Sequence, residues 1–94
     1  MSEMIEQAVK ALSERIEGFD GNAKFVFGDE GTVMLDASGA RAADGEADVT
    51  LTAEPKTFRA IFEGELDPTA AFMSGKLTID GDMGQAMKLA GALS

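Results

Sequence analysis

The sequence is 94 residues long, and 17 acidic against 8 basic side chains give it a formal net charge of −9. This length suits one domain around one core, and a 45% hydrophobic content is enough to form that core. The negative charge disfavours nucleic acid and anionic membranes as partners, and the lack of histidine and cysteine excludes disulfides, zinc sites of the usual kind and most enzyme mechanisms.

The first part of the chain predicts a helix followed by a hairpin. Apolar side chains recur at helical spacing over residues 2–18, so we expect an amphipathic helix that ends at Gly18. Residues 23–27 and 32–37 alternate apolar and polar side chains, which is typical of strands with one buried face. The short glycine-bounded connection at 28–31 predicts that these two strands pair as a hairpin.

The middle of the chain predicts further strands. A brief strand is expected around residues 40–43, within a stretch rich in alanine and glycine. Residues 48–53 alternate again, with Val49 and Leu51 on one side and threonines on the other, so we expect a strand in a sheet with one wet face. We interpret the three clear strands as antiparallel.

The C-terminal part predicts three helices and one more strand. Helices are expected over residues 54–64 and 67–75, because each stretch has a proline in its first turn and a glycine at its end. Residues 76–80 alternate as a strand, and Asp82 then caps a helix with a continuous apolar side. Together these elements predict an α+β fold, a mostly antiparallel sheet of four to five strands covered on one face by helices, in a single domain over residues 1–94.

The acidic residues do not form a convincing metal or catalytic site. Carboxylates at alternate positions in 44–48 resemble the start of a calcium loop, but Val49 and Pro55 stand where such a loop has glycine and glutamate. The Asp-Gly-Asp run at 80–82 is better explained by a helix cap, with Gln85 completing a pattern that resembles a capping box. No phosphate-binding glycine loop is present, so we expect neither a metal nor a cofactor.

The large apolar side chains are more informative. Flexible thioethers and aromatic rings suit a cavity that accommodates variable apolar ligands, although the same residues would also fill an ordinary core. These side chains are Phe25, Phe27, Phe58, Phe62, Phe72, Met34, Met73, Met83 and Met87.

Five motifs in the C-terminal half follow one another in a specific order and spacing. They are Asp48-Val49-Thr50-Leu51-Thr52, the helix from Phe58 to Gly64, Leu66-Asp67-Pro68, Ala71-Phe72-Met73-Ser74-Gly75-Lys76-Leu77, and Gly81-Asp82-Met83 through Met87-Lys88-Leu89. In this order they resemble the sterol carrier protein 2 (SCP2) family, and the similarity covers nearly the whole chain.

The resemblance implies a hydrophobic tunnel between the sheet and the helices, for a fatty acid, an acyl-CoA, a sterol or an isoprenoid. It implies non-catalytic lipid binding or transfer, because catalytic residues are not part of the family pattern. We predict the lipid-binding side chains from their faces and helix positions. They are Phe25, Phe27, Phe58, Phe62, Phe72, Met73, Leu77, Met83 and Met87.

Two other functions stay open at this stage. One is a protein-interaction or accessory module without bound lipid, for example for enzymes of isoprenoid quinone or lipid metabolism, marked by a large exposed apolar patch. The other is a small enzyme that uses carboxylates or Lys56, Lys76 and Lys88, which the lack of histidine and cysteine disfavours. A protein partner or a homodimer is compatible with either carrier or module.

The cellular location is expected to be cytoplasmic. Acidic residues precede the first basic residue of the chain, and the last residues, GALS, do not match the peroxisomal Ser-Lys-Leu signal. No apolar run approaches the ~20 residues of a membrane span, so we expect no stable membrane insertion.

Overall fold

The computed structural model describes residues 3–16 and 18–93 of the chain. Within these residues the elements are, in chain order, α1 (Glu3–Arg15), β1 (Ala23–Phe27), β2 (Thr32–Asp36), β3 (Gly39–Ala42), β4 (Val49–Ala53), α2 (Pro55–Phe62), α3 (Pro68–Met73), β5 (Leu77–Gly81) and α4 (Met83–Leu93). The expected α+β fold is therefore confirmed, and the brief strand expected around residues 40–43 is present as β3.

The first helix is shorter than its periodicity predicts. It ends at Arg15, not at Gly18, and residues 2 and 17 of the predicted span lie outside the described residues. The N–H of Ile16 still donates to the carbonyl of Leu12 at 2.8 Å, and Phe19 further along is buried in the core. Its backbone N–H donates to the carbonyl of Asp36 at 3.1 Å, so the chain after the helix joins β2.

The sheet has the strand order β3-β2-β1-β4-β5. Three of the strand pairs are antiparallel, but β4 pairs with β1 in parallel, which corrects the expectation that the first three clear strands are all antiparallel. The hairpins place β3 at one edge, and residues 43–48 then carry the chain back to the start of the sheet on the other side of β1. Because β4 starts at the same end as β1, the two strands run in the same direction.

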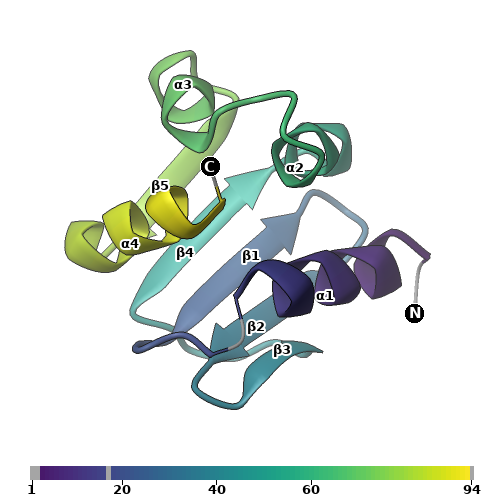
Figure 1. The fold of residues 1–94 in the computed structure, drawn as a ribbon, viewed down its shortest axis with the longest axis vertical. Coiled ribbons are helices and arrows are strands. Elements are labelled where there is room, and N and C mark those ends of the chain that lie inside the picture. Colours follow the sequence, from purple (N-terminus) through teal and green to yellow (C-terminus); the bar gives the residue numbers. More distant parts are fainter. Residues whose placement is uncertain (1–2, 17, 94) are drawn as a thin grey trace.

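The helices form a second layer on one face of the sheet (Figure 1). Helix α1 packs over β2 and β3, and α4 packs over β4 and β5, so each helix covers one half of the sheet. The strand register aligns Val33, Phe25 and Leu51 in one row beneath the helices, and all three side chains are buried. Threonines of β4 and β5 point the other way, which gives the sheet the predicted wet face.

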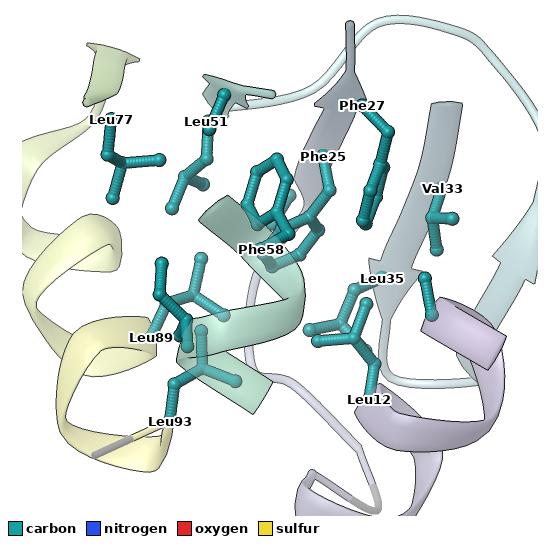
Figure 2. Packing of buried hydrophobic residues seen from close by; sticks show 14 of the residues in the cluster. Leu12, Phe25, Phe27, Val33, Leu35, Leu51, Phe58, Leu77, Leu89 and Leu93 are labelled. Carbon is teal, nitrogen blue, oxygen red and sulfur yellow. The ribbon is translucent and has the colours of Figure 1, made fainter. Parts of the chain in front are cut away.

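Aromatic rings fill the centre of the core. The ring centroids of Phe27 and Phe58 are 4.3 Å apart, and Phe25 meets Phe58 edge-on at 5.9 Å. Figure 2 shows this group with Leu12 and Leu35 on one side of it and Leu89 on the other. Phe25, Phe27 and Phe58 are at most 1% exposed, so their rings are tightly packed at the centre of the core.

Residues 43–48, which connect β3 to β4, are held to the sheet by polar contacts. Lys24 Nζ lies 3.0 Å from Asp44 Oδ1, and the N–H of Asp48 donates to the carbonyl of Asn22 at 2.9 Å. The hydrogen bonds from the Lys24 side chain and then from the N–H of Gly45 lower the pKa of the Asp44 carboxyl. The Asp44 carboxylate therefore has a structural role in holding residues 43–48 to β1.

Candidate functional site

A cavity of about 190 Å³ lies between α4, α3, the end of α2 and the β4–β5 pair. Twelve of its thirteen lining residues are apolar, and the thirteenth is Thr69. The lining residues are Leu51, Phe58, Ile61, Pro68, Thr69, Phe72, Leu77, Ile79, Met83, Ala86, Met87, Ala90 and Leu93. Figure 2 labels Leu51, Phe58, Leu77 and Leu93 among them, with Leu51 and Leu77 of the sheet opposite Leu93 of α4.

The cavity opens to solvent between α3 and α4. The large apolar side chains of its lining that are exposed to solvent are Phe72 at 41%, Met83 at 48% and Met87 at 73%. The inner wall consists of buried residues such as Phe58 and Leu77. An apolar group can therefore enter from the surface and reach the packed core.

Helix α3 is placed by the turns at its two ends. Asp67 caps its start by accepting a hydrogen bond from the N–H of Ala70 at 3.1 Å, and Pro68 occupies the first turn, as predicted. Gly75 ends it at φ +82°, a conformation that favours glycine. The short helix buries Ala71 and places Phe72 at the mouth of the cavity.

Helix α4 supplies most of the opposite wall. Met83, Ala86, Met87, Ala90 and Leu93 recur at helical spacing and share the face that lines the cavity. Two of the five are alanines, whose small side chains leave space that larger residues would fill.

The start of α4 is anchored to the starts of β1 and β4. Asp82 caps the helix through the N–H of Gln85 at 3.2 Å, which confirms the predicted cap. The Gln85 side chain, however, donates to Asp48 at 3.2 Å and accepts from the N–H of Asn22 at 3.1 Å, so it ties α4 to the strands. Gly81 allows this close approach, since a Cβ there would lie 2.3 Å from the carbonyl oxygen of Asp48.

The cavity lining carries no titratable side chain. Within residues 3–16 and 18–93, no group of three or more His, Cys, Asp or Glu side chains could hold a metal ion. The described helices are also too short or too polar for any of them to cross a membrane. The cavity is therefore suited to bury the apolar surface of a ligand.

Comparison with known proteins identifies the fold and the family. A model of the SCP-2 sterol transfer family matches residues 2–94. The chain belongs to this family. The SCP-2 domain is 45% identical over 94 residues to hydroxysteroid dehydrogenase-like protein 2 of Bos taurus, a match that covers 95% of this chain. It spans only 21% of the length of that protein.

Two solved structures from Aedes aegypti have the same fold as this SCP-2 domain. One is sterol carrier protein-2 in complex with palmitate, with a TM-score of 0.80 at 21% identity, covering 100% of this chain and 97% of that one. The other is palmitated SCP2L2, with a TM-score of 0.72 at 25% identity, covering 99% and 95%.

The structure brings five of the nine predicted lipid-binding residues together. Phe58, Phe72, Leu77, Met83 and Met87 all line the cavity of the SCP-2 domain. They come from α2, α3, β5 and α4, which are separate in sequence and meet at one end of the sheet.

The other four predicted residues lie elsewhere. Phe25 and Phe27 are fully buried beneath α1 and α2, where they pack against Phe58 and do not line the cavity. Phe62 lies on the side of α2 that faces α1 and borders a separate surface depression. Met73 is 80% exposed and, one residue after Phe72 in a short helix, does not line the cavity.

The prediction missed the small and aliphatic members of the lining. Ala86, Ala90 and Leu93 lie on the apolar side of the last predicted helix, so its periodicity was a usable signal. Large side chains alone do not identify a cavity lining, because small residues are needed to leave the space. The expected tunnel between the layers stays a prediction, since the cavity described here occupies one end of their interface.

Proposed function

We propose that this SCP-2 domain binds the acyl chain of a lipid, non-catalytically, in the cavity between α3, α4 and the β4–β5 pair. The observation that carries the proposal is a surface-connected cavity with twelve apolar residues among its thirteen lining residues. The two Aedes aegypti structures support it, because proteins of the same fold are described there with palmitate.

The free energy of such binding comes from removing methylene groups from water. Each buried CH₂ contributes about 0.8 kcal/mol, before the costs of association and of ordering the chain are subtracted. The cavity, at about 190 Å³, is below the roughly 300–1,000 Å³ of pockets for drug-sized ligands. It therefore accommodates the end of a chain, with the polar head left at the mouth near Met83 and Met87.

The size of the cavity favours a flexible chain over a rigid ring system. A chain can insert part of its length, whereas fused sterol rings need most of their volume accommodated at once. Acyl-CoA is disfavoured because its phosphates would approach a domain of net charge −9. A fatty acid is thus the ligand class we propose, ahead of a sterol, an isoprenoid or an acyl-CoA.

The alternative of an accessory module without lipid is less well supported. A module that binds no lipid would have a helical layer that leaves no space for a ligand. The cavity under α4 is such a space, so it disfavours this alternative. The activity in the name of the bovine relative is not carried over either, because the chain spans 21% of that protein. We propose no catalytic step for this domain, and a cytoplasmic location stays a prediction.

Two matched alanine substitutions on α4 test the proposal. Ala90→Phe should fill much of the cavity, since a cavity of about 150 Å³ holds one benzene ring. Ala92→Phe places the same ring on an exposed position that does not line the cavity. The measurement is displacement of a fluorescent fatty acid by palmitate, with thermal unfolding as the check that both variants fold.

We expect Ala90→Phe to lower palmitate affinity by at least about tenfold, and Ala92→Phe to leave it unchanged. Cholesterol should compete poorly with the fluorescent fatty acid in the wild-type domain. Equal palmitate affinity in folded Ala90→Phe and Ala92→Phe would show that palmitate does not bind in the cavity. Strong competition by cholesterol would overturn the choice of a fatty acid as the ligand class.

A further inference from the structure

Three helices of this domain end at one place. Helix α1 ends at Arg15, α2 at Phe62 and α4 at Leu93. The Arg15 guanidinium donates one hydrogen bond to the carbonyl of Leu93 at 3.0 Å and another to the carbonyl of Phe62. The last carbonyls of a helix lack intrahelical partners and carry a partial negative charge, so one cation here serves the ends of two helices.

These two carbonyls belong to opposite walls of the cavity. Leu93 itself lines the cavity from α4, and Ile61, next to Phe62, lines it from α2. Arg15 does not line the cavity, and it connects the two walls from outside. It therefore acts on the cavity only through the positions of α2 and α4.

The two ends of α4 are held in different ways. At its start, Gln85 is bonded to Asn22 and Asp48, the residues directly before β1 and β4, close to Gly81 where the backbones approach closely. At its end, Leu93 is joined to the rest of the molecule by its buried side chain and by the bond from Arg15. Because the Arg15 side chain is exposed, water can replace that bond when the end of α4 moves.

We propose that Arg15 is a positioning residue that limits the length of the acyl chain accepted by the cavity, an inference that rests on the proposed function. A short chain fits the cavity of about 190 Å³ with both Arg15 bonds in place. A long chain can insert more of its length only if the end of α4 moves away from α2, which breaks these bonds. Removing Arg15 therefore favours long chains over short ones.

The test compares octanoate and palmitate as ligands of the wild-type domain, Arg15→Ala, Arg15→Lys and Arg59→Ala. Arg59 is the matched control because it is an exposed arginine on α2 whose side chain donates to neither carbonyl. Dissociation constants come from displacement of a fluorescent fatty acid. Hydrogen exchange of the ligand-free proteins at residues 90–93 reports whether the end of α4 is released.

We expect Arg15→Ala to raise the ratio of palmitate to octanoate affinity by about five- to tenfold, the effect of losing one or two hydrogen bonds. Exchange at residues 90–93 should become faster in this variant and stay unchanged in Arg59→Ala. Arg15→Lys retains the positive charge and can reach one carbonyl, so its ratio should be intermediate. It also provides a readout if Arg15→Ala does not fold.

Faster exchange with an unchanged chain-length ratio would make Arg15 a purely structural residue and overturn the inference. Unchanged hydrogen exchange at residues 90–93 in Arg15→Ala would show that Arg15 does not hold the end of α4, which would also overturn the inference. A wild-type domain that takes up neither octanoate nor palmitate would instead overturn the proposed function, so the two failures are distinguishable.

Discussion

The two halves of the helical layer fill the space above the sheet differently. Over β2 and β3, α1 buries Leu12 completely against a sheet surface that includes Leu35, also fully buried. Over β4 and β5, α4 and α3 leave a cavity whose lining includes the partly exposed Phe72 and Met87. The space between α1 and the sheet is tightly packed, whereas the space between α4 and the sheet is open to solvent.

The difference follows from which side chains each helix turns toward the sheet. Helix α1 buries branched residues such as Ile5 and Leu12, whereas α4 lines the cavity with the alanines Ala86 and Ala90 beside flexible methionines. Tight packing of branched and aromatic residues gives stability, while small and flexible residues leave deformable space. We therefore expect substitutions in the first half to act on folding and those in the second to act on binding.

The largest expected effect is a difference in the free energy of unfolding between Phe27→Ala and Phe72→Ala. Phe27 is fully buried and packs against Phe58 with ring centroids 4.3 Å apart, so its truncation should lower the free energy of unfolding by about 3–5 kcal/mol. Phe72 is 41% exposed, and its truncation should cost less than about 1 kcal/mol while weakening palmitate uptake. Urea unfolding of both variants measures the contrast, and similar losses of stability would abolish the distinction between the halves.

A smaller effect is expected from Met87→Glu, with Met73→Glu as its control. Both methionines are largely exposed, so neither change should alter thermal stability much. Only Met87 lines the cavity, where a new carboxylate would repel a fatty acid head group at the mouth. We expect palmitate affinity to fall about tenfold, or 1.4 kcal/mol, in Met87→Glu alone. An equal fall in Met73→Glu would point to net charge as the cause.

The smallest effect concerns the acid stability of the β2–β3 edge. The N–H of Ser38 and then the Arg41 side chain, whose Nη1 is 2.9 Å from the carboxylate, lower the pKa of Asp36 from its usual 3.8. A lowered folded-state pKa stabilises the protein above the unfolded value, and that stabilisation is lost as pH falls through the folded value. Asp36→Asn can still accept from Ser38 but removes the charge.

Wild type should accordingly be more stable than Asp36→Asn near neutral pH, and the gap should narrow as the pH falls below 3.8. Urea unfolding at several pH values measures the gap. Fatty acid affinity should be equal in the two proteins, because Asp36 does not line the cavity. A gap that is constant with pH would mean that the charge of Asp36 does not contribute.

Local signals in the sequence predicted much of the fold. The Asp67 cap and the glycine end at Gly75 are confirmed, because both depend on atoms a few residues apart. The Gln85 side chain was harder to predict, since its partners Asn22 and Asp48 lie 63 and 37 residues away. For the same reason, alternation identified β1 and β4 as strands but not their parallel pairing.

The sequence by itself determined the type and order of the helices and strands and which of their faces are apolar, because these depend on residue types and short spacings. Only the tertiary structure decided which phenylalanines border the cavity. Phe58 and Phe72 line it while Phe27 does not, although nothing in their local sequence separates them. That division depends on how closely distant elements pack, and α1 closes its half of the sheet while the alanines of α4 leave the other half open.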